Sequence, residues 1–285
     1  PLIVADPDTA AATHALPHPG IVLGRHPHAD ARTVRMLAER IGDATGLLAV
    51  GAGTINDLCK RVGAQRGLPY VVHGTAASMN GFASGIAAIL SDDGLKTTVT
   101  SAPPRAIVLD TQVLAAAPWS MARAGLGDLL SKPVSDSDWW LADQLEGVGY
   151  SSLPSEVVSA AFEAASAAAP GLPLGDPEAH GALGQALVLS GVAMVVAGSS
   201  APASGGEHLL SHLIDMEAVA AKRDVKLHGA QVGVTTLISA ALYQRLLRAR
   251  PTDVVEPPRW ADEEARLKEA FGPLADTIIP QAKKK

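Results

Sequence analysis

The sequence predicts an α/β N-terminal half followed by an all-helical C-terminal half. In the first half, short β-branched and apolar runs alternate with segments of helical periodicity and with glycine turns, which is the rhythm of a parallel sheet. After Pro118 the β-branched clusters become rare and long stretches rich in Ala, Leu and Glu follow. We therefore expect two domains, residues 1–117 and 118–285.

The expected elements follow from periodicity and from the breakers between them. Strands are expected at residues 2–6, 46–50, 69–72 and 106–110, and helices at 33–41, 55–65, 156–169, 182–197 and 231–248. Loops rich in Pro, Gly and Ser are expected at 147–154 and 198–206. The most apolar stretch, 182–198, is interrupted by Gly184, Gln185, Ser190 and Gly191 and is short for a bilayer crossing of about 20 residues. We expect a buried helix there and no membrane span.

Composition limits the classes of partner and compartment. Lys and Arg number 23 against 29 Asp and Glu, and the formal charge is -6, with no basic stripe. Nucleic acid is therefore not an expected partner. The single cysteine, Cys59, cannot form an intrachain disulfide and fits a reducing compartment, so we expect the cytoplasm.

Two glycine-rich turns follow successive predicted strands. The first, residues 51–57, places Gly51, Ala52 and Gly53 between a strand and a helix, where backbone N–H groups can bind a pyrophosphate. It lacks the full G-x-G-x-x-G spacing, so a plain turn without a ligand remains open. The second, residues 74–84, is dense in hydroxyls and glycines. Together the two turns favour a nucleotide-binding cleft at the edge of the sheet.

Three histidines and one acid form a candidate metal site. His208 and His212 are four residues apart and share one face of an expected helix. His228 begins another apolar helix, and Asp128 stands inside a largely apolar segment. One carboxylate with two or three imidazoles suits a divalent transition metal. The histidine pair can share one metal, can divide between ligand and proton donor, or can bind no metal. The buried acid favours a metal because an unpaired buried charge is costly.

Five motifs together resemble a known family, in the same order over nearly the whole chain. They lie at residues 51–57, 75–79, 125–132, 207–212 and 228–229. The family is sn-glycerol-1-phosphate dehydrogenase, within the superfamily of iron-containing alcohol dehydrogenases, glycerol dehydrogenase and 3-dehydroquinate synthase. The resemblance implies a dehydroquinate synthase-like fold: a Rossmann-like α/β dinucleotide-binding domain and an all-α metal-binding domain, with metal and substrate in the cleft between them.

The resemblance also implies roles for individual residues. Asp128, His208 and His228 match the family's metal ligands, and His212 matches a histidine that contacts the substrate rather than the metal. The cofactor-binding positions that it implies are Asp6, Gly51, Ala52, Gly53, Thr54, Asp57, Thr75, Ser78 and Ser84. Among these, Asp6 follows the first strand, where an acid binds the adenosine ribose and favours NAD over NADP. Either nicotinamide cofactor remains open.

One substrate-binding position departs from the family pattern. The family usually has an aspartate after the Ser-Met dipeptide, and here the residue is Asn80, whose amide binds a hydroxyl but cannot act as a base. Asn80, Asp128 and His212 are thus the expected substrate contacts. Lys132, four residues beyond Asp128, and Arg123 are candidates to contact a phosphate, and each could equally be a surface charge.

The resemblance implies a metal-dependent, NAD(P)-linked oxidoreductase. The expected reaction interconverts dihydroxyacetone phosphate and sn-glycerol 1-phosphate, or a closely related phosphorylated polyol, with Asp128, His212 and Lys132 as its catalytic residues. Zinc is the first choice of metal, and nickel or iron would also suit the ligands. Alternatives are a superfamily member with another substrate, a synthase- or lyase-type enzyme that uses NAD transiently, and an inactive ligand-binding relative. A homo-oligomer is also open, because helical domains often pair through apolar faces.

Overall fold

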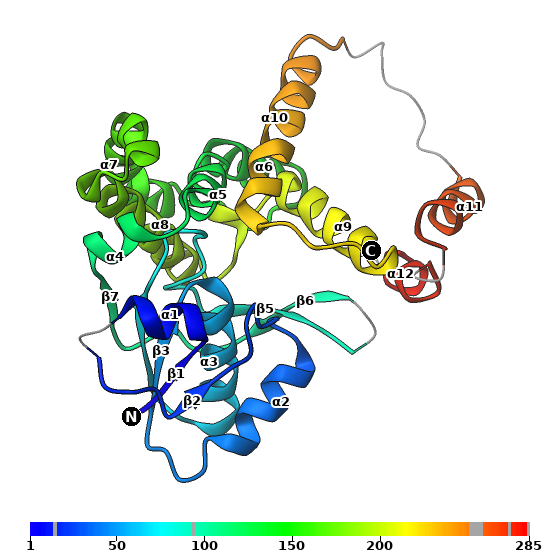
Figure 1. The fold of residues 1–285 in the computed structure, drawn as a ribbon. Helices are drawn as coiled ribbons and strands as arrows, with labels where there is room; N and C mark the ends of the chain where they lie inside the picture. The colour runs from blue at the N-terminus through cyan, green and yellow to red at the C-terminus, as the bar shows by residue number, and fades with distance from the viewer. Residues whose placement is uncertain (14–15, 93–94, 251–258, 273–274, 284–285) are drawn as a thin grey trace.

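The N-terminal half is built on a parallel sheet (Figure 1). The structure is a computed structural model that describes residues 1–13, 16–92, 95–250, 259–272 and 275–283. The sheet has five strands in the order β2-β1-β3-β4-β7, and every neighbouring pair is parallel. These strands are β1 (Leu2–Ala5), β2 (Ile21–Val22), β3 (Leu47–Gly51), β4 (Tyr70–Gly74) and β7 (Ile107–Leu109).

The order of the strands reverses between β1 and β3. The chain moves from β1 outward to β2 and then returns to the other side of β1 to form β3. At such a reversal, the loops that leave the carboxyl ends of the two central strands separate and open a crevice. Asp6 follows β1 directly, and Gly51 is the last residue of β3. Two of the predicted cofactor positions therefore flank the reversal point.

Three helices accompany the first strands: α1 (Pro7–Ala12), α2 (Ala31–Arg40) and α3 (Gly53–Arg66). The four strands and both helices expected in this half are confirmed, with small shifts at their ends. An antiparallel hairpin of β5 (Ile86–Leu90) and β6 (Lys96–Thr100) was not expected. Sequence patterning missed it because β6 reads Lys-Thr-Thr-Val-Thr, which has one apolar residue and shows no alternation.

The described part of the chain after β7 is helical, as predicted. It contains α4 (Thr111–Ala116), α5 (Trp119–Leu129), α6 (Lys132–Glu146), α7 (Leu153–Ala168), α8 (Pro177–Ala197), α9 (Gly206–Ala220), α10 (His228–Leu246), α11 (Trp260–Phe271) and α12 (Ala275–Ala282), with short 3-10 turns at Ala169–Leu174 and Ala201–Ala203. α8 begins earlier than its apolar periodicity indicates, because the Asp176 carboxylate caps it and Pro177 fits its first turn.

Each half of the chain has its own cluster of buried apolar side chains. The first joins the sheet to α2, α3 and β5 and includes Val4, Leu37, Leu58 and Val72, each fully buried. The second joins α4, α5, α7 and α8 around side chains such as Leu183. Burial of this apolar surface is the main stabilising contribution in each half.

Two helical segments are long and apolar enough to cross a membrane, judged by length and composition only. They are Leu153–Leu174, which includes α7, and Pro177–Ala197, which is α8. The most apolar window of α8 is 56% buried within the protein, whereas that of the first segment is 17% buried. The core helices of folded domains pass the same test, and α8 packs in the second cluster as such a helix.

Helices α5 and α10 cross at a point where glycines replace side chains. A Cβ added at Gly229 would lie 2.0 Å from the Ala124 carbonyl oxygen, and one added at Gly127 would lie 2.4 Å from the Gly229 oxygen. The two backbones therefore touch directly. His228 is the first residue of α10, and Asp128 follows Gly127, so this crossing sets the separation of two predicted metal ligands.

We predict that Gly229→Ala destabilises the protein by about 3 kcal/mol, because its methyl group would overlap backbone atoms that have no room to move. Urea denaturation measures the change in the free energy of unfolding. Gly24→Ala is the matched control, since nothing lies within 4 Å of the added Cβ there. Equal stability of the two variants would contradict the close crossing.

Candidate metal centre

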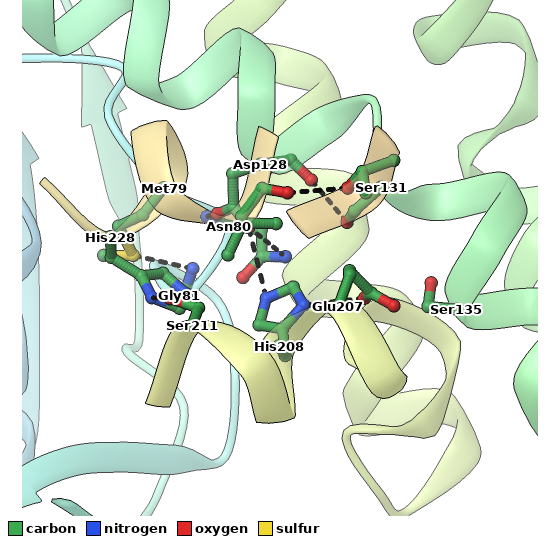
Figure 2. A network of polar contacts seen from close by, with 12 residues as sticks. Met79, Asn80, Gly81, Asp128, Ser131, Ser135, Glu207, His208, Ser211 and His228 are labelled. Atoms are coloured by element: carbon green, nitrogen blue, oxygen red, sulfur yellow. Dashed lines mark hydrogen bonds and ion pairs between the residues drawn. The ribbon is translucent and has the colours of Figure 1, made fainter. Parts of the chain in front are cut away.

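Three predicted ligands from three helices meet at one point (Figure 2). Asp128 lies near the end of α5, His208 in the first turn of α9, and His228 at the start of α10. One ligand atom from each lies within 4.8 Å of the other two. The structure thus brings together residues that are far apart in the sequence, and His212 is outside this group.

The Asp128 carboxylate is fully buried and receives donors from several directions. The Asn80 backbone N–H donates to Oδ2 at 2.7 Å, and the Asn80 side-chain amide lies 3.4 Å from Oδ1. The Nε2 atom of His208 is 3.3 Å from Oδ1. Asn80 therefore lies against the acid of the site with both of its donors, as Figure 2 shows.

His208 lies between two carboxylates. Its Nδ1 is 2.7 Å from Oε1 of Glu207, and its Nε2 faces Asp128. Burial disfavours the charged imidazole, but the hydrogen bonds and negative charges of the two acids outweigh it and raise the pKa of His208 to about 9. In the metal-free protein a proton on His208 therefore balances part of the negative charge.

Glu207 is fully buried, and the sequence analysis gave it no role. Its Oε1 also accepts the Gly205 backbone N–H at 2.9 Å, which fixes the carboxylate beside His208. Metal-binding histidines usually donate their second ring nitrogen to a carboxylate or a carbonyl. The sequence feature that could have indicated this role of Glu207 is its place directly before His208. Sequence alone does not show that the two side chains meet.

His228 is held by a chain of polar contacts from α9 and α10. The Ser211 hydroxyl lies 3.4 Å from its Nδ1 and 3.0 Å from Oε1 of Gln231. Burial, followed by the charge of Lys96, lowers the pKa of His228 well below its usual value. The imidazole is therefore neutral at neutral pH, the form in which histidine binds metals.

His212 lies one turn after His208 on α9, as the spacing predicts. Its ring centroid is 6.1 Å from that of His228. Burial, followed by the charges of Lys96 and His208, lowers the pKa of His212 to about 4. A neutral imidazole beside the three clustered ligands is able to accept a proton from a bound hydroxyl group.

The residues present fit a divalent metal. The group offers one carboxylate oxygen and two imidazole nitrogens, a donor set that suits zinc, nickel and ferrous iron. Both Asp128 and Glu207 are fully buried acids, and Oε2 of Glu207 has no hydrogen-bond partner among the described residues. A cation at this point would offset negative charge that is otherwise costly to bury.

The first glycine turn has the geometry predicted for it. Gly51 ends β3, Ala52 is the N-cap of α3, and no side chain caps the first turn of that helix. A Cβ at Gly51 would lie 2.6 Å from Ile55, so the turn packs tightly on the helix behind it. Thr54 follows in the first turn. The first turn of α3 therefore begins at the carboxyl end of β3, and a helix N-terminus in such a place can bind an anion.

Three of the remaining predicted cofactor positions have side-chain hydrogen-bond partners within the protein. Oδ1 of Asp6 caps α1 through the N–H groups of residues 8 and 9. Asp57 accepts the Ala88 N–H at 3.2 Å, and the Ser84 hydroxyl lies 3.0 Å from Nζ of Lys60. The two other hydroxyl residues of the second turn are both buried: Thr75 and Ser78.

Lys132 is the first residue of the helix that follows Asp128. α5 ends at Leu129 and α6 begins at Lys132, so the two residues Asp128 and Lys132 do not share a continuous helix. The Lys132 ammonium donates to the Pro202 carbonyl oxygen at 2.5 Å. Burial lowers the pKa of Lys132 to about 8. Arg123, the other phosphate candidate, is exposed on α5.

A parallel doubly wound sheet with an acid and two histidines on the helices beside it is typical of the iron-containing alcohol dehydrogenase class. The sequence profile of iron-containing alcohol dehydrogenase matches residues 10–118. Solved structures agree in fold: glycerol dehydrogenase from Schizosaccharomyces pombe has a TM-score of 0.66 at 20% identity, over 85% of this chain and 64% of that one. A probable glycerol dehydrogenase from Sinorhizobium meliloti has a TM-score of 0.69 at 18% identity, over 95% and 75%.

Sequence relatives define the family more narrowly. Glycerol-1-phosphate dehydrogenase of Haloquadratum walsbyi is 34% identical over 275 residues, which cover 96% of this chain and 71% of the relative. The chain therefore belongs to the glycerol-1-phosphate dehydrogenase family. The Bacillus velezensis enzyme of the same name is 38% identical over 219 residues, or 76% of this chain and 55% of that one. The chain thus spans about half the length of some curated relatives that it matches.

We predict that Glu207→Gln weakens metal binding by about 10- to 100-fold, because the variant loses the negative charge that supports His208 as a ligand. Competition with a chromophoric chelator measures the metal dissociation constant. Glu217→Gln, which changes an exposed acid on the same helix, is the control. Equal affinity of the two variants would show that Glu207 does not act on the metal.

We predict that metal affinity rises about tenfold for each pH unit up to about pH 9, because binding must displace one proton from His208. The stability of the metal-free protein changes in the opposite direction. Because the pKa of His208 is raised by folding, its contribution to stability is fully present below the unfolded-state pKa of 6.5 and is lost as the pH rises through about 9. Chelator competition and urea denaturation from about pH 6 to about pH 9 measure the two trends. A flat affinity profile would contradict the protonated state of His208.

Proposed function

We propose that this protein reduces dihydroxyacetone phosphate to sn-glycerol 1-phosphate, or acts on a closely related phosphorylated polyol, with NADH or NADPH. The observation that carries the proposal is the meeting of Asp128, His208 and His228 at one point, in a chain that also has a strand-to-helix glycine turn. The names of the curated relatives support the substrate and the use of either nicotinamide cofactor.

The residues divide into a metal-binding set, a cofactor-binding set and a proton-transferring group. Asp128, His208 and His228 would hold the metal, with zinc as our first choice and nickel or iron as alternatives. The N–H groups at residues 51–54 would hold the cofactor pyrophosphate, with Asp6 at the ribose. When bound, the metal supplies Lewis acidity at the substrate oxygen and the nicotinamide supplies the hydride.

The protein's own groups manage the proton and the charge. His212, neutral because burial lowers its pKa, accepts the proton of the substrate hydroxyl in the oxidation direction and returns it in the reduction. Asn80 donates to Asp128 and so keeps that carboxylate oriented. The Lys132 ammonium donates to one backbone carbonyl oxygen, and its catalytic role remains part of the proposal.

Several broader features belong to the same proposal. We place the boundary between the cofactor-binding and metal-binding domains after residue 117, supported by the two separate apolar clusters. A cytoplasmic location is supported by the single buried cysteine, Cys59. A homo-oligomer is supported by the exposed apolar side chains of α10, such as Leu237.

A second candidate function rests on Asn80, which stands where the family pattern has an aspartate. The changed side chain would alter the hydroxyl contacts and hence the polyol that is preferred. To test this candidate, kcat/KM is measured for the parent and for Asn80→Asp with a panel of phosphorylated and unphosphorylated ketones. A shift in the preferred ketone would support a substrate other than dihydroxyacetone phosphate for the native chain.

We predict about one bound metal per chain by elemental analysis, and metal-dependent NADH oxidation with dihydroxyacetone phosphate. His228→Ala should lower both the metal content and the turnover, because it removes one of three ligands. The control is His28→Ala, which changes an exposed histidine near the N-terminus that is not a candidate ligand. Bound metal without turnover on this ketone would refute the substrate and keep the metal site.

A further inference from the structure

The β5–β6 hairpin carries a lysine to the helix that bears His212. β6 contacts α9, and the two lie side by side in Figure 1. Nζ of Lys96, the first residue of β6, forms an ion pair with Oδ2 of Asp215 at 2.5 Å. Asp215 is three residues after His212 and so lies about one turn further along the same helix face. The pair therefore places the Lys96 ammonium beside the proton-transferring end of the site.

Lys96 keeps donors free that the buried Lys60 uses. The Lys60 ammonium has three acceptors, which are two carbonyl oxygens and the Ser84 hydroxyl, at 2.7, 2.8 and 3.0 Å. Lys96 has one acceptor among the described residues, the Asp215 carboxylate, and its side chain remains 19% exposed. Since an ammonium has three donors, two remain for a ligand.

The charge of Lys96 acts on both sides of the crevice. After burial, it is the largest cause that lowers the pKa of His212 and of His228. It also opposes the rise that burial causes in the pKa of Asp57, in the first turns of α3 on the cofactor side. The ammonium is therefore within electrostatic reach of the metal-binding helices and of the glycine turn.

We propose that Lys96 is the specificity-determining residue that binds the phosphate group of the substrate. A phosphate dianion and a partly buried ammonium form a strong charge-assisted hydrogen bond. Asp215 holds the ammonium in place but occupies only one of its three hydrogen-bond donors. This inference rests on the proposed function, because that function supplies a phosphorylated ketone beside His212.

Two variants separate phosphate binding from a purely structural ion pair. Lys96→Gln and Asp215→Asn both break the ion pair, but only Lys96→Gln removes the cation. Inorganic phosphate is titrated calorimetrically into each metal-loaded variant. Lys268→Gln is the matched control, because Lys268 is also ion-paired, with Glu264 on α11. Phosphate that binds the metal alone would give the same affinity in all three variants.

We expect Lys96→Gln to weaken phosphate binding by about 10- to 100-fold, as for loss of one charged hydrogen bond. Asp215→Asn should bind phosphate at least as tightly as the parent, because a competing anion is gone. Equal losses in the two variants would overturn the proposal and make the pair a structural brace. Unchanged affinity in Lys96→Gln would overturn it as well.

Kinetics distinguish this proposal from the proposed function. Lys96→Gln should lose about 10- to 100-fold in kcat/KM for dihydroxyacetone phosphate and markedly less for dihydroxyacetone. Equal losses on both ketones would overturn phosphate recognition. If the parent consumes no NADH with either ketone, the proposed function fails, and the phosphate titration still decides the role of Lys96.

Discussion

The buried carboxylate of Asp128 is the constraint around which the helical half is arranged. An ionised acid without solvent contact is stable only with donors or cations at its oxygens. The Asn80 backbone N–H donates to one oxygen of Asp128 from the sheet half, and Nε2 of His208 faces the other oxygen. The glycine crossing of α5 and α10 then brings His228 close enough to complete the set. Sheet, loop and helices thus converge on one charge.

Charge balance at this point gives a physical reason for the amide at position 80. Asp128 and Glu207 are two buried acids, and the His208 imidazole, whose pKa is raised, lies between them. A third carboxylate at position 80 would add repulsion, whereas the Asn80 side chain donates toward Asp128. The departure from the family pattern therefore agrees with the hydrogen bonding, even though it changes the contacts available to a substrate.

Sequence alone could predict what depends on local pattern. The glycine turn after β3, the shared helix face of His208 and His212, and the helix that starts at His228 all follow from spacing and end signals. The resemblance supplied the ligand set, which no periodicity could assemble across three helices. The pairing of Glu207 with His208, the break before Lys132 and the reach of Lys96 depend on rotamers and tertiary contacts. Local pattern carries no information about them.

The placement of the ligands along the chain has a consequence for biosynthesis. The side chains of the first apolar cluster all precede α4, except for Val188, which packs at its margin, so the sheet half can collapse while the rest is still being synthesised. The metal centre cannot form until His228 has left the ribosome and α10 has crossed α5. Binding of an ion at that stage would tie the ends of a long chain segment together and would favour the completed fold. Metal supply would thus act on the yield of folded protein as well as on its chemistry.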